Sequence, residues 1–401
     1  MSVVYTAITA DGQTIRYQDH KRHWWLLSVV YPLMPLLGIW AHHTTGWPLL
    51  LALPLVISYG LMPLLDAWIG GDHNNPPEAV VPQLDADRSY RWLTWATVPL
   101  HFVSLIACAW WVGTQAMPWW AVALMAYVAG AGSGLGLNTA HELGHKNHPL
   151  EQWLARLVLA VPAYGHFTVE HGRGHHRHVA TPEDHASARM GESIYRFALR
   201  ELPGGVRRAW RLEGDRLRAL GRSPFGVRNT MLQSYAITAV LQLGLLLAFG
   251  WVMLPFLLIH NLVAWWQLTS ANYVEHYGLL RERGADGRYE APQPWHSWNT
   301  NHLVTNLATF HLQRHSDHHA YPSRRYQCLR DFPDLPRLPS GYFGMFVLAY
   351  LPWLWFKVMD PRLLALPQVR GDLRRVNIDP SARAAMVAML ARHDQSRAKP
   401  H

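Results

Sequence analysis

Long apolar stretches alternate with polar ones along the chain. Six of them approach the roughly 20 residues that an α-helix needs to cross the hydrocarbon core of a bilayer. They cover residues 24–41, 47–69, 92–112, 118–140, 230–249 and 252–274. Tryptophan pairs lie at several of their ends, at 24–25, 110–111 and 119–120, as expected for side chains that prefer the headgroup region. The pattern predicts an all-α integral membrane protein with six transmembrane helices and a cytoplasmic histidine-rich helical cap.

Three apolar segments do not fit a simple span. The run 153–169 contains Pro162 and Gly165, and the run 341–358 has arginine on both sides. We expect both runs to be interfacial or re-entrant. The stretch "GAGSGLGLN" at 130–138 does not fit the G-x-G-x-x-G fingerprint, and no strand precedes it. It therefore predicts close packing of small residues within the fourth span.

The charges give an orientation. Only 16% of the residues are charged, against roughly 25% in an average soluble domain, and the formal net charge is +9. The loops after the first, third and fifth spans contain no lysine or arginine, whereas the other polar segments contain several. The positive-inside rule places these basic segments in the cytoplasm. The expected organisation is a cytoplasmic N-terminal segment 1–23, helices one to four in 24–140, a cytoplasmic histidine segment 141–229, helices five and six in 230–276, and a cytoplasmic C-terminal segment 277–401.

Nine of the 25 histidines form four groups. The stretches "HELGHK", "EHGRGHHRH", "NYVEHYG" and "LQRHSDHHAYP" supply His141, His145, His171, His175, His176, His276, His315, His318 and His319. Residues i and i+4 share a helix face, so His141 with His145, and His171 with His175, can each grip one metal ion. Adjacent histidines diverge by about 100° and can serve two ions. The spacing predicts a two-metal centre, whereas the isolated His101, His166, His260 and His302 are expected to be hydrogen-bonded structural residues.

The identity of the metal is open from spacing alone. "HELGH" matches H-E-x-x-H, the signature of zinc proteases, but one zinc uses only three protein ligands and an open position. Imidazole also suits iron and copper, and two iron ions with four or five nitrogens each would use the whole set. Ligating histidines usually donate their other N–H to a carboxylate or carbonyl. We expect that orienting role from five neighbouring acids, Glu142, Glu170, Asp184, Glu275 and Asp317.

These motifs resemble the histidine boxes of the membrane fatty acid desaturase and hydroxylase superfamily. "NYVEHYGL", "LQRHSDHHAYPSRRYQ" and "NNPPEAVVP" are similar to the bacterial alkane 1-monooxygenases. The resemblance implies a non-haem diiron enzyme of the bacterial inner membrane that uses O₂ to hydroxylate the terminal carbon of medium or long n-alkanes, with the nine histidines as iron ligands. It also implies electrons from rubredoxin and its NADH-dependent reductase. His178 and His185 depart from the family pattern, which commonly has Asp and Pro there.

Substrate and partner surfaces are predicted from the same pattern. Leu55, Ser58 and Met62 share one face of the second span and are expected to line an alkane pocket. The chain has two cysteines and no flavin fingerprint, so its electrons must come from a partner. A basic cytoplasmic face would steer an acidic rubredoxin; it comprises Arg173, Arg177, Arg324 and Arg325, with Arg196, Arg207, Arg208 and Arg330.

Two alternatives remain open at this point. A fatty acyl desaturase or related membrane hydroxylase shares the histidine boxes. A membrane zinc protease shares only "HELGH". A metal transporter would need more polar residues along its spans, and nucleic acid is not an expected partner.

Overall fold

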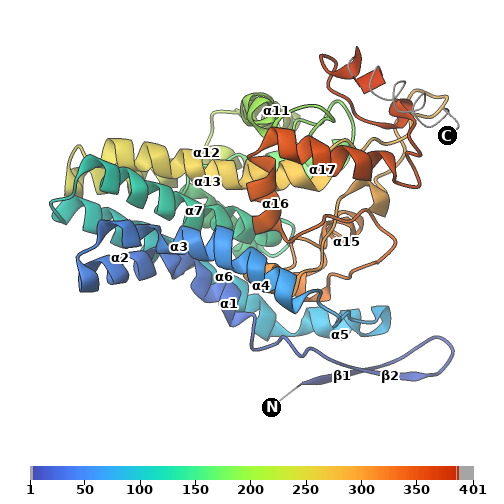
Figure 1. The fold of residues 1–401 in the computed structure, drawn as a ribbon, viewed down its shortest axis with the longest axis horizontal. Coiled ribbons are helices and arrows are strands. Elements are labelled where there is room, and N and C mark those ends of the chain that lie inside the picture. Colours follow the sequence, from blue (N-terminus) through green and yellow to red (C-terminus); the bar gives the residue numbers. More distant parts are fainter. Residues whose placement is uncertain (1–2, 385, 388–401) are drawn as a thin grey trace, which may run out of the picture.

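The computed structural model describes residues 3–384, 386 and 387, and is mostly helical (Figure 1). It begins with a small antiparallel hairpin of β1 (Val4–Ile8) and β2 (Thr14–Gln18), in which Tyr5 is paired with Tyr17. The hairpin lies at the edge of the polar end of the molecule, away from the bundle of long helices. It packs against the short segment η4 (Glu78–Val80), and Gln83 of α5 (Val81–Ala86) donates a hydrogen bond to the Thr6 carbonyl oxygen.

The first two predicted spans are helical but interrupted. Proline lacks an N–H and clashes with the preceding turn, and Pro32, Pro35, Pro54 and Pro63 all fall within these segments. The first span is therefore divided into α1 (Leu26–Val30), η1 (Tyr31–Leu33) and α2 (Met34–Thr45). The second is divided into η2 (Pro48–Ala52), α3 (Leu53–Val56), the π-helical turn η3 (Ile57–Leu61) and α4 (Met62–Ile69).

The next three spans are long continuous helices. α6 (Arg88–Thr114) begins where the side chain of Asp87 accepts a hydrogen bond from the Ser89 N–H, and α12 (Thr230–Phe249) is capped in the same way by Asn229. α7 (Trp119–Gly144) lies between them in the sequence. Together with Leu26–Thr45 and Pro48–Ile69, these make five helices long and apolar enough to cross a membrane. The chain is therefore a multi-pass membrane protein.

The predicted sixth span forms a helix, but it is more polar than expected. α13 (Met253–His276) covers the predicted residues 252–274, yet it is not among the helices apolar enough to span by composition. His260, Asn261 and Gln267 interrupt its apolar run. Each of these side chains has a hydrogen-bond partner on another helix: His260 on Ser133, Asn261 on Gln242 and Gln267 on Tyr59. The polar residues of α13 therefore face protein rather than lipid.

The glycines of "GAGSGLGLN" explain how closely α7 approaches α13. A Cβ at Gly130 would lie 2.5 Å from the His260 carbonyl oxygen, and one at Gly134 would lie 2.5 Å from Gln267 Cβ. The prediction of small-residue packing is confirmed.

The remaining helices gather around the polar ends of α7 and α13 (Figure 1). After α7 come α8 (Pro149–Ala160), α9 (Phe167–Glu170), the π-helical turn η5 (His171–His175), α10 (His176–His178) and the long α11 (Ile194–Ala219). After α13 come η6 (Pro294–His296), α14 (Leu303–Ala308), α15 (His315–Ala320), η7 (Tyr326–Cys328), α16 (Tyr342–Ala349), α17 (Pro352–Leu364) and η8 (Leu373–Arg375).

The two ambiguous apolar runs do not form straight spans. The run 153–169 is divided between α8 and α9, with Ala163 at a φ of 56° in the connecting turn. The run 341–358 forms α16 and α17, which are bent by 119° at their junction, the geometry of a broken span or a re-entrant loop.

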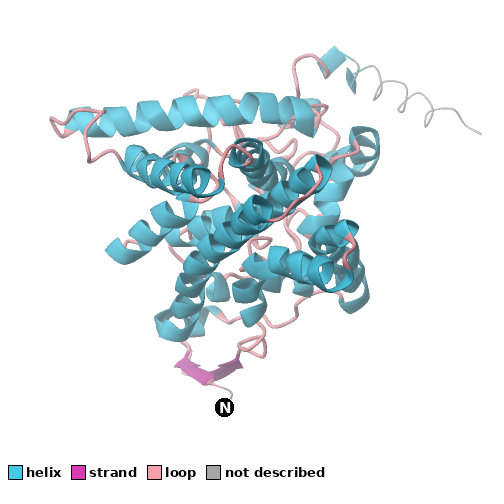
Figure 2. Cartoon of the chain, turned by 90° about the vertical axis from the view of Figure 1, so that its left-hand side faces the viewer, coloured by secondary structure: helices cyan, strands magenta, loops and turns pink. Residues whose placement is uncertain are grey.

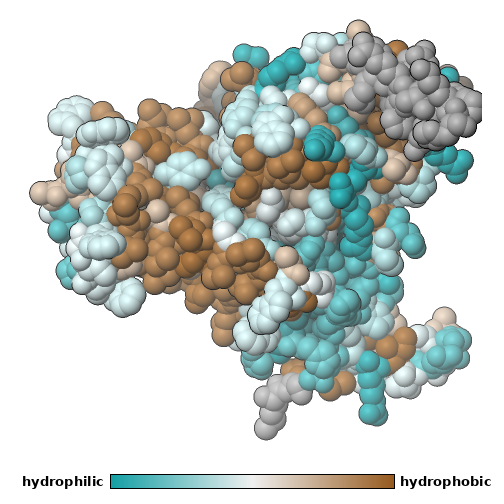
Figure 3. Space-filling view, viewed as in Figure 1, coloured by the Kyte–Doolittle hydropathy of each residue, from teal (hydrophilic) through white to brown (hydrophobic). Residues whose placement is uncertain are grey.

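The molecular surface, like the sequence, is divided between apolar and hydrophilic regions. An apolar area covers the half formed by the spans, and hydrophilic residues gather over the half that contains α15 and the hairpin (Figure 3). Seen from the apolar end, the long helix α11 lies across the top of the molecule (Figure 2).

Candidate metal centre

All nine predicted histidines meet in two adjacent clusters. His141, His145, His171, His176 and His318 form the first cluster, and His175, His276, His315 and His319 form the second. Within each cluster the potential ligand nitrogens lie within 4.8 Å of one another. The rings of His176 and His319, one from each cluster, have centroids 4.4 Å apart. The sequence thus places nine imidazoles, divided five and four, around two neighbouring positions.

The elements that carry the histidines explain the division. His141 and His145 lie one turn apart at the end of α7 and belong to one cluster. On α15, His315 and His319 are also four residues apart and share the second cluster, while the intervening His318 contributes to the first. The predicted divergence of the adjacent pairs is confirmed, because His175 and His176, like His318 and His319, lie in different clusters.

One pairing was predicted incorrectly. His171 and His175 were expected to share an ion, but His171 lies with His176, and His175 belongs to the other cluster. The reason is local: residues His171–His175 form a π-helical turn, in which hydrogen bonds join residues i and i+5. That wider turn brings His176, rather than His175, beside His171.

The nitrogens are arranged as metal ligands rather than as ordinary hydrogen-bond partners. The Nε2 atoms of His171 and His176 are 3.0 Å apart, those of His176 and His318 3.2 Å, and those of His315 and His319 3.0 Å. When two imidazoles bind the same ion, each at about 2.1 Å, their nitrogens come to about this separation. Nε2 of His141, His145 and His175 is buried without a hydrogen-bond partner in the described structure. The donor set fits two transition-metal ions.

Burial keeps most of these rings neutral. It holds the pKa of His171, His176 and His318 well below the usual value of 6.5, and the neighbouring histidines reinforce the effect. A neutral imidazole has the free lone pair that a metal ion needs. The first cluster is therefore in its ligating form at neutral pH.

His175 is the exception, because it has a carboxylate partner. Burial lowers its pKa, but the Asp184 carboxylate outweighs this effect, so the net pKa is raised. Asp184 Oδ2 lies 2.8 Å from His175 Nδ1 and also accepts a hydrogen bond from Ser187 Oγ. This contact leaves Nε2 directed to the cluster and orients the ring, as predicted for Asp184.

One further contact orients a ligand of the second cluster, and one carboxylate faces its ligand nitrogens. His276 Nδ1 lies 3.0 Å from the backbone carbonyl oxygen of His296, a partner that sequence reasoning missed because a carbonyl leaves no signal in side-chain identity. Glu275 Oε2 lies 3.4 Å from His315 Nε2, and its other oxygen is buried without a partner. Nε2 is the ligand nitrogen of His315, so Glu275 faces the metal positions, and the expectation that it orients a ligand ring through the other nitrogen is corrected.

The other three acids lie one contact farther out than expected. Glu142 forms an ion pair with Lys146 at 3.1 Å, Glu170 with Arg208, and Asp317 with Arg324 at 3.0 Å. These acids hold cations, not imidazoles, and the expectation that they orient ligand rings directly is corrected. The position of Glu142 also contradicts the zinc-protease alternative, in which this residue would have to face the metal as general base.

An apolar cavity leads from the membrane helices to both clusters. It encloses about 900 Å³, including the part open to its surroundings. Leu55 and Ser58 line it as predicted, whereas Met62 packs with Tyr31, Ala308 and Phe343 and does not line it. Its walls also include residues of α7 and α16 that were not predicted. At its polar end it reaches His141, His171, His315 and Glu275.

The predicted basic face is only partly available. Arg173, Arg177, Arg196 and Arg207 are exposed, but Arg173 is paired with Glu213 and Arg196 with Asp379. Arg324 and Arg325 are buried, where Arg324 pairs with Asp317 and Glu78, and Arg325 with Glu151. Arg208 is buried as well, and Arg330 pairs with Glu78. These four cannot offer a free positive charge to a partner, and that part of the prediction is wrong.

The isolated histidines stay outside both clusters. His166 is bonded to Tyr235, His260 to Ser133 and His302 to Thr300, as expected. His101 is buried in α6, but its Nε2 has no hydrogen-bond partner in the described structure, contrary to the expectation. His178 pairs with Glu183, and the ring of His185 packs against Gly204. None of these six belongs to either cluster.

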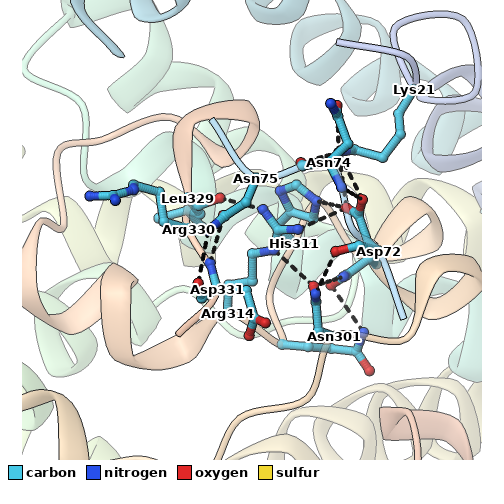
Figure 4. Close-up of polar contacts among 12 residues, drawn as sticks. Lys21, Asp72, Asn74, Asn75, Asn301, His311, Arg314, Leu329, Arg330 and Asp331 are labelled. Carbon is cyan, nitrogen blue, oxygen red and sulfur yellow. Dashed lines mark hydrogen bonds and ion pairs between the residues drawn. The ribbon is translucent and has the colours of Figure 1, made fainter. Parts of the chain in front are cut away.

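A buried network beside the second cluster contains another histidine that is not a ligand (Figure 4). His311 Nε2 lies 3.2 Å from Asp72 Oδ2, which also contacts Arg314 at 2.8 Å and Lys21 at 2.9 Å. His311 Nδ1 is bonded to the Tyr326 carbonyl oxygen. Both ring nitrogens are therefore occupied, and His311 serves to anchor the segment that leads into α15.

Fold and site together define a helical membrane protein with two buried polyhistidine clusters that can bind metal ions, at the end of an apolar cavity. Residues 118–349 match the model of the fatty acid desaturase family. The chain is 54% identical to alkane 1-monooxygenase of Pseudomonas putida over 371 residues, 92% of either chain. It is 54% identical to that of Ectopseudomonas oleovorans, over 92% of this chain and 91% of the other, and 52% identical to alkane 1-monooxygenase 1 of Alcanivorax borkumensis, over 93% and 92%. The chain belongs to the alkane 1-monooxygenases, and it is an enzyme.

Proposed function

We propose that the protein hydroxylates the terminal carbon of medium- or long-chain n-alkanes, with O₂ as co-substrate and two non-haem iron ions bound by the nine histidines. The observation that carries the proposal is the apolar cavity that joins the membrane helices to both histidine clusters. Bound iron would supply the O₂ activation that amino-acid side chains cannot perform.

The residues of the cavity account for the choice of substrate. An alkane has no polar group, so only shape and apolar burial can hold it. Leu55, Leu135, Leu268 and Phe343 give the cavity apolar walls. Alkanes partition into the bilayer, and a cavity between membrane helices takes them from that phase and presents one chain end to the metal positions.

The polar end of the cavity contributes one group that can hold a proton, the carboxyl group of Glu275. Glu275 has one oxygen without a partner in the described structure. We infer that this carboxyl group exchanges protons with water at the metal positions during turnover.

Electrons would come from an external donor, rubredoxin with its NADH-dependent reductase. The exposed arginines at positions 177 and 207, which form no ion pair with an acidic side chain in residues 3–384, favour an acidic partner. Their side of the bundle would face the cytoplasm by the positive-inside rule, with both termini and the metal centre on that side of the bacterial inner membrane.

The test is metal analysis combined with product analysis. Protein in lipid nanodiscs, supplied with reduced rubredoxin, O₂ and alkanes from octane to hexadecane, should contain two iron ions per chain and release 1-alkanols. A chain with one zinc and no iron would refute the metal assignment. Formation of unsaturated products from fatty acyl substrates, without any alkanol from alkanes, would favour the desaturase alternative.

A further inference from the structure

α11 is an amphipathic helix that lies across the ends of the spans. Figure 1 shows it end-on while α12 and α13 run sideways, and Figure 2 shows it lengthwise above them. The helix is thus roughly perpendicular to the spans, and therefore parallel to the plane of a bilayer that those spans cross. At one end it reaches past the helices beneath it (Figure 2).

Large apolar side chains are exposed on α11 and on the loop that follows it. Tyr195, Leu199 and Val206 recur at helical spacing, and Leu199 is 79% exposed. In the loop, Phe225 is 77% exposed and Val227 89%. These two residues lie five and three positions before Thr230, where the fifth span begins. Such exposure is costly in water, but not at a membrane surface.

The position of this apolar stripe follows from its neighbours. The ring of Tyr195 stacks on Trp266 of α13 at 5.5 Å, and Trp210 contacts Phe225 at 5.4 Å. Trp266 belongs to the helix that runs beside the spans, and Phe225 is joined to the fifth span by four residues. The stripe therefore lies on the side of α11 that faces the apolar half of the molecule.

Arginines flank the stripe. Arg207, Arg211, Arg222 and Arg228 are exposed, and none forms an ion pair with an acidic side chain in residues 3–384. By contrast, Arg196 and Arg200 of the same helix are paired with Asp379 and Glu192. Unpaired guanidinium groups beside an exposed apolar stripe match the phosphate layer above the acyl chains.

We propose that α11 and the loop 220–229 form a lipid-binding surface that inserts its apolar stripe into the headgroup region and binds anionic phospholipids through these four arginines. A protein partner fits the surface less well, because a rigid docked protein beside the first residues of the fifth span would occupy the volume of the lipid headgroups. The surface is separate from the metal ligands, and the proposal does not depend on the reaction that the clusters catalyse.

The first test measures insertion. Phe225→Cys is labelled with a polarity-sensitive fluorophore in nanodiscs of phosphatidylcholine with 30% phosphatidylglycerol, and Ile8→Cys, on the exposed hairpin, is the control. The native Cys108 and Cys328 are buried and should react little with the fluorophore. Any labelling of these two cysteines is measured on the chain without an introduced cysteine. The label at position 225 should emit at shorter wavelength than that at position 8, and brominated lipids should quench it. Equal, water-like emission at both positions would overturn the proposal.

The second test measures lipid preference. The triple variant Arg211→Gln, Arg222→Gln, Arg228→Gln is compared with a control triple variant on exposed arginines outside α11 and its loop, Arg283→Gln, Arg288→Gln, Arg370→Gln. Native mass spectrometry counts phosphatidylglycerol retained from mixed nanodiscs. Each arginine near an anionic surface contributes roughly a five-fold preference, so the first variant should lose most of the retained phosphatidylglycerol and the control should not.

Two outcomes would contradict the lipid assignment. Equal retention by both triple variants would show that the arginines do not select anionic lipid. If instead retention is unchanged but the rubredoxin concentration needed for half-maximal turnover rises only in the first variant, the surface is a donor-docking site. If the first variant retains less phosphatidylglycerol but its turnover in detergent is unchanged, the surface binds lipid and has no part in the proposed reaction.

Discussion

Two buried polar regions lie side by side in this protein and differ in how their groups are satisfied. In the Asp72 network, the carboxylate contacts Lys21, His311 and Arg314, and each partner has further hydrogen bonds (Figure 4). In the histidine clusters, several ring nitrogens are buried without a partner. Buried polar groups are almost always hydrogen-bonded, so the first region is complete as it stands and the second is organised for ions. His311 and His315 lie four residues apart and belong to different regions.

The largest expected effect comes from removing a ligand. His176→Ala should lower iron content to one ion or fewer per chain and reduce alkanol formation by at least about 100-fold, while the unfolding temperature of the metal-free protein changes little, since the ring has no structural partner to lose. Iron analysis, turnover and thermal unfolding measure the three effects. His178→Ala, two residues along and outside both clusters, is the control and should retain iron.

Breaking the Asp72 network should instead lower the stability of the metal-free protein. Burial alone would raise the pKa of Asp72, but His311, Arg314 and Lys21 hold it well below its usual value, so the group is ionised. Asp72→Ala leaves buried cations without their counter-charge and should cost about 3–5 kcal/mol of unfolding free energy. Denaturant unfolding of the metal-free protein measures this. A variant as stable as the parent would remove the basis of the comparison.

Glu201 offers a third case, a buried carboxyl group whose hydrogen-bond partners are neutral. It accepts hydrogen bonds from Thr269 and Asn272, and burial raises its pKa to about 7. An acid with a raised folded pKa contributes stability that is present below its unfolded pKa of 4.5 and is lost as pH rises through 7.

Glu201→Gln should therefore flatten the decline in stability between pH 5 and pH 8. The gain at pH 8 relative to pH 5 is at most roughly 3 kcal/mol. Unfolding measured across this range reports it, with Glu282→Gln, an exposed acid, as the control. A parental pH dependence in the Glu201 variant would mean that this carboxyl group is ionised in the folded protein.

A smaller effect is expected at the Asp184–His175 contact, where a carboxylate orients a histidine of the second cluster. Asp184→Asn keeps the size of the side chain but cannot hold His175 as a charged acceptor, and should weaken iron binding about 10- to 100-fold. Iron titration measures it, and Glu183→Gln, on an exposed neighbour, should bind iron as the parent does. Unchanged affinity would show that burial alone orients His175.

The smallest effect concerns the cavity wall and should leave both polar regions intact. Leu55→Phe fills part of the cavity, and a methylene group in an apolar site is worth about 1–3 kcal/mol. The preferred alkane should become shorter by a few carbons, as measured by competition between alkanes of different length. Val56→Phe, on an adjacent exposed residue, should not change the preference.

Much of this arrangement was predictable because it depends on local pattern. Apolar runs of span length predicted six membrane helices, of which five are long and apolar enough to span, and helical spacing predicted the nine histidines and the divergence of adjacent pairs. The errors arose where a distant partner decides the outcome. Arg324 pairs with Glu78, 246 positions away, and Arg325 pairs with Glu151, 174 positions away, so neither is free at the surface as expected. Met62 was placed on the correct helix but packs behind the cavity because a π-helical turn precedes it.

The π-helical turn at His171–His175 makes two different motifs equivalent in space. "HSDHH" is H-x2-H-H and lies on an ordinary helix, whereas "HGRGHH" is H-x3-H-H and contains the wider turn. In both motifs the first and last histidines serve one cluster and the middle one serves the other: His171 and His176 with His175 opposite, and His315 and His319 with His318 opposite. The extra residue of the longer motif is absorbed by the turn. The two motifs are therefore equivalent: each supplies two histidines to one cluster and one histidine to the other.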